Sequence, residues 1–299
     1  MAVMFEAGSG SASDRGTDVW ASKKSGSEDD DDDKSGGKSE DDDDLKGGED
    51  DDRLSGGNGD DSVSGGNGDD MLSGDDGDDS VLGGDGDDDE HGGNGHDSLY
   101  GGNGADSLDG EADDDTLFGG DGNDEVIGGA GNDALYGNRH DDTIDGGDGD
   151  DTVYGGQQQD SILGGAGNDV LIGNQSDDSI HGGDGDDWLH GGQGQDLLFG
   201  EAGDDTLDGG QAEDTLSGGL GADTFRFSGG SKDTIADFSE ADGDLIALAA
   251  RQYDEEDVAD ALADAEATST GLKLHFGSVD LMLTGVTSAQ ITAADFTFF

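Results

Sequence analysis

The strongest constraint on this chain is a nine-residue repeat that runs from Gly47 to Arg226 without an insertion or deletion. Twenty consecutive units follow the pattern Gly-Gly-x-Gly-x-Asp-x-U-x, in which U is a large apolar residue. The first place is Gly and the sixth is Asp in every unit, and the eighth is apolar in all units but one, where it is Glu90. Because the register never changes, every unit must occupy an equivalent position in a repeating structure.

Each unit divides into a short strand and a turn. Places seven to nine, such as Ser98-Leu99-Tyr100, predict a three-residue strand with one inward side chain. The first six places predict a turn, because glycine adopts a positive φ without steric cost. One such strand cannot bury enough apolar surface alone. We therefore expect the units to stack and to bury a continuous column of eighth-place residues.

Stacking would also bring the sixth-place aspartates together. Carboxylates in register repel one another, and a hard divalent cation with six to eight oxygen ligands removes that conflict. Ca²⁺ tolerates irregular cages of protein oxygens, so we expect several calcium ions as cofactors. The predicted metal ligands are Asp52, Asp61, Asp70, Asp79, Asp88, Asp97, Asp106, Asp115, Asp124, Asp133, Asp142, Asp151, Asp160, Asp169, Asp178, Asp187, Asp196, Asp205, Asp214 and Asp223.

The charge balance agrees with cation binding. Lys and Arg number 12 and Asp and Glu 77, which gives a formal net charge of −65. Such a charge disfavours compaction unless cations bind. Nucleic acids and anionic membrane surfaces require basic patches, so neither is expected as a partner. A salt-adapted or disordered protein would also be acidic, but random acidity does not produce a nine-residue register.

Several other functions are disfavoured by what the sequence lacks. There is no cysteine, which excludes disulfides and thiolate chemistry. The longest apolar stretch, 245–250, is too short to span a bilayer, and the first twelve residues do not resemble a cleavable secretory signal. The six histidines are scattered and form no His-Glu-x-x-His motif, and no other side chain is placed convincingly for catalysis. We therefore predict that the chain is not an enzyme.

Composition divides the chain into three segments. Residues 1–46 are acidic and rich in Ser and Gly, and we expect them to be mostly disordered, with a decayed repeat at their end. Residues 47–226 are the calcium-binding array, and residues 227–299 regain a globular texture. In the last segment the pattern predicts a helix over 254–267, with Asp254 as its N-cap, and a β-hairpin over 272–283. Since a solenoid needs a cap over its last coil, we expect a small α+β cap there.

With these motifs in view, a family resemblance can be stated. The array resembles the repeats-in-toxin, or haemolysin-type, calcium-binding repeats. The segment from Gly218 to Phe238 resembles the end of the array in serralysin-type secreted proteins. The final Asp295-Phe296-Thr297-Phe298-Phe299 looks like the C-terminal secretion signal of that family. The alternative for these phenylalanines is a last strand of the cap, and both interpretations can hold together.

The resemblance implies an all-β fold, a right-handed parallel β-roll in which two nonapeptides make one coil. Odd and even units would lie on opposite sheets, and aspartates eighteen residues apart, such as Asp61 and Asp79, would share an ion. It also implies a secreted, extracellular protein that leaves the cell through the type I secretion machinery, a one-step ATP-driven channel. The expected function is a secreted calcium-binding protein whose array folds on binding Ca²⁺ outside the cell. A calcium-dependent surface or matrix adhesin, and the export module of a secreted enzyme lacking its catalytic domain, remain alternatives.

Some units depart from the glycine pattern, and the departures predict an asymmetric roll. The second-place glycine is replaced by Asp75, Glu111, Asn138, Asn174 and Glu201, and the fourth-place glycine by Asp113, His140, Gln158, Ser176 and Ala212. In the C-terminal half, the Gln- and Asn-rich turns alternate with intact ones, so coils of eighteen residues would gather them on one edge. We expect wider or distorted turns and weak calcium binding on that edge.

Glu90 is the other departure, because it occupies an inward place between Leu72 and Leu108. Burying an unpaired carboxylate costs several kcal/mol. We therefore expect the coil to loosen there, or the side chain to turn outward with the strand locally broken.

Overall fold

The computed structural model describes residues 33–35, 42–228, 232–277 and 279–299. Most of the segment expected to be disordered, 1–46, lies outside the described residues. Two short strands from it, β1 (Asp33–Ser35) and β2 (Asp44–Lys46), pair with the array. The expectation that this segment is mostly disordered stays a prediction. Leu45 lies opposite Val63, eighteen residues on, so the repeat register extends to residues before Gly47.

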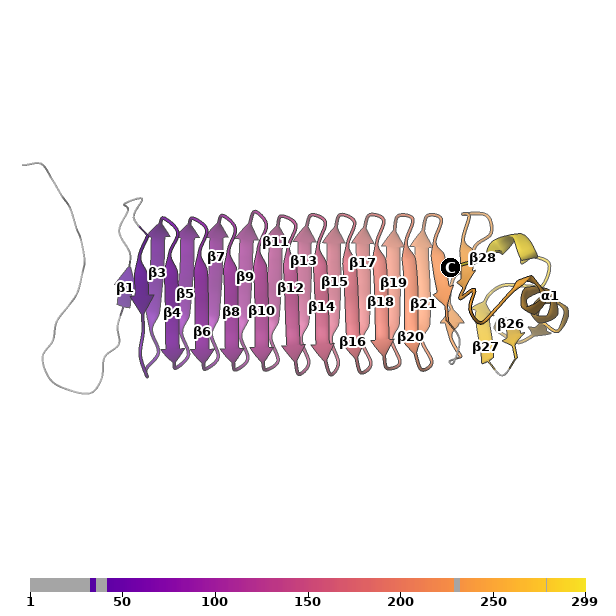
Figure 1. Cartoon of the computed structure of the whole chain (residues 1–299), viewed down its shortest axis with the longest axis horizontal. Coiled ribbons are helices and arrows are strands. Elements are labelled where there is room, and N and C mark those ends of the chain that lie inside the picture. Colours follow the sequence, from indigo (N-terminus) through magenta and orange to yellow (C-terminus); the bar gives the residue numbers. More distant parts are fainter. Residues whose placement is uncertain (1–32, 36–41, 229–231, 278) are drawn as a thin grey trace, which may run out of the picture.

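The described chain is an elongated stack of coils with a small cap at its C-terminal end (Figure 1). Strands from successive nonapeptides alternate between two parallel sheets, sheet A with the odd-numbered strands and sheet B with the even-numbered strands. Each array strand pairs with the strand eighteen residues away, as Leu99 does with Leu117. The prediction of an all-β roll with two nonapeptides per coil is confirmed.

The array strands contain six residues each, twice the predicted length. They are β3 (Arg53–Asn58), β4 (Ser62–Asn67), β5 (Met71–Asp76), β6 (Ser80–Asp85), β7 (Asp89–Asn94), β8 (Ser98–Asn103), β9 (Ser107–Ala112), β10 (Thr116–Asp121), β11 (Glu125–Ala130), β12 (Ala134–Arg139), β13 (Thr143–Asp148), β14 (Thr152–Gln157), β15 (Ser161–Ala166), β16 (Val170–Gln175), β17 (Ser179–Asp184), β18 (Trp188–Gln193), β19 (Leu197–Ala202), β20 (Thr206–Gln211) and β21 (Thr215–Leu220). Each covers places seven to nine of one unit and one to three of the next. The turn is therefore limited to places four to six, and the predicted six-residue turn was too long.

The first-place glycine explains the longer strand. It faces inward, as the eighth place does, because side chains alternate along the strand. A Cβ atom on Gly92 would lie 2.5 Å from Asp97 Oδ2 and 2.9 Å from the Gly110 carbonyl oxygen, which leaves no room for it. Lack of space thus requires glycine at the first place. The predicted reason, a positive φ, applies to the second and fourth places, such as Gly57 (φ 113°) and Gly59 (φ 120°).

The core consists of two facing columns of eighth-place side chains, one from each sheet. The apolar members of these columns from Leu54 to Leu216 are at most 3% exposed. Burial of one such side chain contributes about 1.5–3 kcal/mol, so each added coil strengthens the stack. A coil supplies only two of these residues, which explains why the fold depends on repetition.

Glu90 remains in this core column. Its side chain is 0% exposed, it lies between Leu72 and Leu108 in sheet A, and β7 is continuous. The expectation of a loosened coil or an outward side chain was therefore wrong. Burial, assisted by the nearby Asp106 and Asp88 carboxylates, raises the pKa of Glu90 well above its usual value. A protonated, uncharged carboxyl group is the form that this interior accommodates.

The cap continues both sheets beyond the array. Sheet B adds β22 (Thr224–Phe227), β24 (Leu245–Leu248) and β28 (Phe296–Phe298). Sheet A adds β23 (Thr234–Ile235), β27 (Val279–Thr284), β26 (Gly271–Phe276) and β25 (Glu266–Ala267). The antiparallel pairing of β26 with β27 confirms the predicted hairpin. The final phenylalanines thus include a last strand of the cap.

A single helix in the described cap, α1 (Glu255–Ala263), lies near a short 3₁₀ turn, η1 (Ala293–Asp295). Asp254 is the N-cap, as predicted, and its side chain accepts hydrogen bonds from the amides of Glu256 and Asp257. The helix ends earlier than predicted, because β25 pairs with β26 instead of extending the helix. No helix in the described part of the chain is long and apolar enough to cross a membrane.

Candidate metal centres

The structure places the twenty predicted aspartates in two rows, one along each edge of the roll. Edge 1 carries Asp52, Asp70, Asp88, Asp106, Asp124, Asp142, Asp160, Asp178, Asp196 and Asp214. Edge 2 carries Asp61, Asp79, Asp97, Asp115, Asp133, Asp151, Asp169, Asp187, Asp205 and Asp223. All are at most 5% exposed. Such burial of a carboxylate is costly unless a partner compensates for its charge.

One oxygen of each carboxylate is used to join successive coils. The amide of a sixth-place residue donates to Oδ1 of the aspartate eighteen residues on, as from Asp133 to Asp151 (2.7 Å) and from Asp151 to Asp169 (2.8 Å). The second oxygen is different. In the described residues, eighteen of these aspartates, from Asp61 to Asp214, have a buried Oδ2 that accepts no hydrogen bond. These atoms form a continuous series of unsatisfied, negatively polarised groups.

The raised pKa values of the aspartates in these rows also favour a bound cation. Burial raises the pKa of Asp115 to about 8, and repulsion from Asp97 and Asp133 adds to the effect. On the opposite edge, burial and the neighbouring Asp124 and Asp160 raise the pKa of Asp142 to about 8. Ionisation of these rows is therefore unfavourable without a partner, so the carboxyl groups keep their protons to higher pH, and a bound divalent cation would remove the conflict.

Backbone carbonyls complete an all-oxygen donor set. Successive turns stack so closely that a Cβ atom on Gly104 would clash with the Gly86 carbonyl oxygen and lie 3.1 Å from Asp106 Oδ1. Carbonyl oxygens of one coil thus face the glycines of the next, beside the sixth-place carboxylates. Ca²⁺ prefers carboxylate and carbonyl oxygens in flexible arrangements, so these residues fit that ion. Occupancy of the individual sites stays a prediction.

A second row of side chains at the fifth place was missed by the sequence reasoning. Here the hydrogen bonds run in the opposite direction, since the Asn168 amide donates to Asp150 Oδ1 (2.7 Å) and the Asp186 amide donates to Asn168 Oδ1 (2.9 Å). The signal was present, because the fifth place is Asp or Asn in most units. These exposed oxygens lie next to the buried row, so they extend the set of groups available to a cation at each turn.

Ten of the eleven substituted glycine positions, all but Asp50 in the first unit, keep the turn conformation. Each retains a positive φ between 70° and 80°. The hydrogen bonds that join successive aspartates are also alike on the two edges, with 2.9 Å from Asp160 to Asp178 on edge 1 and 2.8 Å from Asp169 to Asp187 on edge 2. The expectation was of wider or distorted turns on the Gln- and Asn-rich edge. These hydrogen bonds show no widening there, because the backbone accepts the strain and retains its register.

The C-terminal half of edge 1 nevertheless differs in its turn hydrogen bonds. From Gly131 to Gly203 on edge 2, the fourth-place amide donates to the third-place carbonyl of the next coil, as from Gly149 to Ala166 (2.7 Å). In the described part of edge 1, the amides of His140, Gln158 and Ser176 make no such bond. A groove of about 430 Å³ lies along this stretch, lined by Asp141, Asp142, Thr143, Gln159, Asp160, Ser161, Asp177, Asp178, Ser179, Gln195 and Leu197. Weaker calcium binding on this edge remains a prediction.

Comparison with known proteins agrees with this geometry. The family model of the RTX calcium-binding nonapeptide repeat (4 copies) matches residues 39–72, 64–89, 91–126, 127–162, 163–198 and 190–225. The chain belongs to this RTX repeat family. The RTX matches begin at residue 39, consistent with the extension of the register through Leu45.

Two solved structures show local similarity to this RTX chain. The solution structure of the AlgE6R3 subunit from the Azotobacter vinelandii mannuronan C5-epimerase is 31% identical, covers 42% of this chain and 80% of its own, and has a TM-score of 0.34. The crystal structure of the extracellular lipase LipA from Serratia marcescens is 20% identical, covers 69% of this chain and 40% of its own, and has a TM-score of 0.25. No curated protein matches the chain.

Proposed function

We propose that this protein is a secreted calcium-binding protein whose repeat array folds when it binds Ca²⁺ outside the cell. The observation that carries the proposal is the two rows of buried aspartates, eighteen of which, from Asp61 to Asp214, have an Oδ2 atom that accepts no hydrogen bond in the described residues. Family membership and the net charge of −65 support the same function. The carboxylates of Asp52 to Asp223 named above would hold the ions together with turn carbonyls, and the role of the array is structural rather than catalytic.

The free energy of calcium binding would stabilise the folded state of the array. The ligands of one ion come from units eighteen residues apart, so the complete site does not exist in the unfolded chain. Extracellular calcium modules bind with dissociation constants on the order of 10⁻⁴–10⁻³ M. At a free Ca²⁺ concentration tenfold above such a constant, one site stabilises the folded state by about 1.4 kcal/mol, and a row of sites multiplies this gain.

Equilibrium dialysis against ⁴⁵Ca²⁺ tests the binding function. Ten units on each edge leave nine gaps on that edge, so we expect several ions per chain and at most eighteen within residues 47–226. Excess Mg²⁺ should compete poorly, because it demands a tight octahedron and gives up its water reluctantly. An absence of specific Ca²⁺ binding at millimolar concentration would contradict the proposed function.

We further propose that the chain leaves the cell through the type I secretion machinery. The support is the resemblance of the acidic and apolar C-terminus to the signal of that pathway and the family membership of the array. A variant lacking the last four residues should accumulate inside the cell while the full chain appears in the culture medium. Equal amounts of both chains in the medium would argue against this route.

A further inference from the structure

We propose that His91, Asp109 and Glu111 form a site for a transition metal of the Zn²⁺ class on the outer face of sheet A. The site is separate from the calcium rows, because its residues occupy outward places of β7 and β9 rather than the turns. His91 lies directly opposite Asp109 in the sheet, and Glu111 follows two residues later on the same face. One ligand atom from each of the three residues lies within 4.8 Å of the others.

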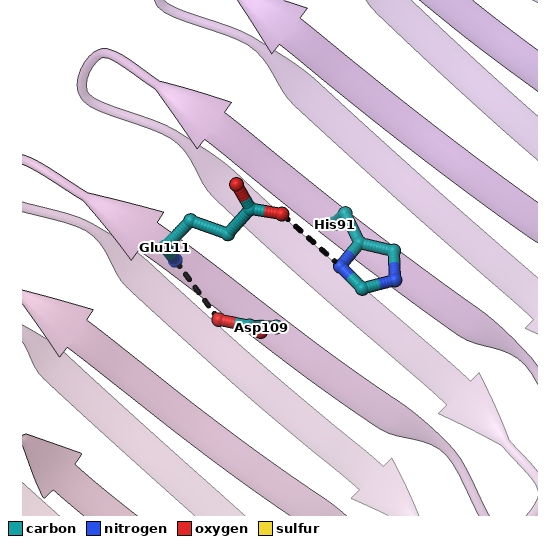
Figure 2. A group of neighbouring side chains, drawn as sticks. All are labelled: His91, Asp109 and Glu111. Atoms are coloured by element: carbon teal, nitrogen blue, oxygen red, sulfur yellow. Dashed lines mark hydrogen bonds and ion pairs between the residues drawn. The ribbon is translucent and has the colours of Figure 1, made fainter.

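The distances favour a metal over a simple hydrogen bond. His91 Nδ1 and Glu111 Oε1 are 3.4 Å apart, as Figure 2 shows, which exceeds the usual length of an N–H···O hydrogen bond. Two ligands of a tetrahedral Zn²⁺ with bond lengths of 2.0–2.2 Å lie about 3.3 Å apart. The Nδ1 atom is itself buried and has no hydrogen-bond partner in the described structure. The pair therefore has the spacing of two vertices of a metal site.

The remaining contacts hold the three ligands in place. The Glu111 amide donates to Asp109 Oδ1 (3.0 Å), which orients the Asp109 carboxylate (Figure 2). On the other side of the ring, His91 Nε2 lies 3.3 Å from Asp89 Oδ1. A carboxylate at Nε2 favours the tautomer that leaves Nδ1 unprotonated, the form that binds metal. Asp89 is thus a positioning residue for this site.

The backbone of Glu111 provides an independent argument. Glu111 stands where the repeat has a second-place glycine and retains a φ of 70°, which costs of order 1 kcal/mol in strain for a residue with a Cβ atom. The repeat contains many glycines at this place, so a substitution to Glu is not required by the turn. Its carboxylate faces the imidazole of the preceding coil, where a glycine would offer no ligand.

A second histidine pair in the same sheet supplies a matched control. His181 and Glu201 occupy the equivalent places in β17 and β19, with nearly the same exposure as His91 and Glu111. Phe199 stands where the first site has Asp109, and its ring stacks on His181 at 4.6 Å. His181 Nδ1 and Glu201 Oε1 are 2.8 Å apart, an ordinary hydrogen-bond distance. This pair lacks the third ligand, so we expect it to bind Zn²⁺ much more weakly than the site at His91.

The preference for a transition metal follows from the donor set. Imidazole suits Zn²⁺, Cu²⁺ and Ni²⁺, whereas Ca²⁺ takes oxygen ligands. Saturation with millimolar Ca²⁺ therefore occupies the turn sites without filling the imidazole site. This difference lets the two kinds of site be titrated separately in the intact, folded chain.

Titration calorimetry of the full chain with Zn²⁺ in saturating Ca²⁺ tests the proposal. The wild type should show one Zn²⁺ site whose affinity exceeds that of the nonspecific binding by surface carboxylates. His91→Ala and Asp109→Ala should abolish it, His181→Ala should retain it, and Asp89→Asn should weaken it about 10- to 100-fold. Phe199→Asp should add a second site. Circular dichroism of each variant in Ca²⁺ confirms that the roll is folded.

Two results would overturn the proposal. One is a Zn²⁺ isotherm that is the same for the wild type and His91→Ala, which would assign all binding to the acidic surface. The other is equal loss of binding in His181→Ala and His91→Ala, which would show that any histidine beside a glutamate suffices and that Asp109 is not a ligand.

Discussion

At the scale of single residues, Glu90 is the clearest unfavourable case, because it places a carboxyl group in an apolar core. It lies fully buried among leucines, and both of its carboxyl oxygens lack hydrogen bonds in the described structure. Burial of an unsatisfied polar group costs about 1–3 kcal/mol in proteins. We expect Glu90→Leu to raise the free energy of unfolding in saturating Ca²⁺ by an amount of this order, measured by urea denaturation.

The converse substitution provides the control for Glu90. Leu108→Glu places a second carboxyl group in the adjacent position of the same column and should lower stability. If Glu90→Leu left the urea midpoint unchanged, the side chain would have to be hydrated in solution.

The first-place glycine gives a second prediction at this scale. Gly92→Ala would push a methyl group against the Asp97 carboxylate and the next coil, and overpacking of this kind costs about 1–3 kcal/mol. Gly48→Ala is the control, since no heavy atom lies within 4 Å of a Cβ placed there and this second-place glycine, unlike Gly57, has no positive φ. Thermal unfolding in Ca²⁺ should show a lower midpoint for Gly92→Ala alone. Equal effects of the two substitutions would contradict the packing argument.

At the scale of one coil, the positions where a side chain replaces the second- or fourth-place glycine retain strain that glycine would relieve. Gln158 and Asn174 have nearly equal φ angles, 76° and 80°, but Asn tolerates the left-handed region better. We expect Gln158→Gly to stabilise the calcium-loaded roll by about 1 kcal/mol and Asn174→Gly by less. Urea denaturation at fixed Ca²⁺ measures both. A larger gain from Asn174→Gly would show that strain is not what distinguishes these turns.

At the scale of one coil, some features could be predicted from the sequence and others could not. The unbroken register predicted the inward columns, because equivalent units must stack equivalently, whereas the coil of eighteen residues came from the family resemblance and the alternation of the turns. Strand length was underestimated, since the buried first-place glycine looks like a turn residue until its neighbours in space are known. The neighbours of Glu90 were predicted correctly, but not that its carboxyl group stays in the column, because that depends on its protonation in the interior. The meeting of His91 with Glu111 was not predicted, because these residues are not direct partners in the register.

At the scale of the whole molecule, the aspartate rows predict an unusual pH dependence without calcium. Burial and mutual repulsion raise the pKa of many of these groups in the folded chain, to about 6 for Asp106 and about 8 for Asp115. In an unfolded chain the pKa of Asp is about 3.9. The folded state therefore binds more protons between these values, and its stability falls as the pH rises from about 4 to 8.

Far-ultraviolet circular dichroism in calcium-stripped buffer checks this pH dependence. We expect β-structure to be favoured near pH 4 and lost as the pH approaches 8. The opposite order, with more β-structure at pH 8 than at pH 4, would mean that the buried aspartates do not control the stability of the calcium-free chain.

The central claim, that calcium binding drives the folding of the roll, is tested most directly by the same spectroscopy at pH 8 as Ca²⁺ is added. The account predicts a coil spectrum in chelator, a cooperative change to β-structure at millimolar Ca²⁺, and no such change with Mg²⁺ at the same concentration. A chain that is already rich in β-structure in chelator at pH 8, and that does not respond to Ca²⁺, would contradict it.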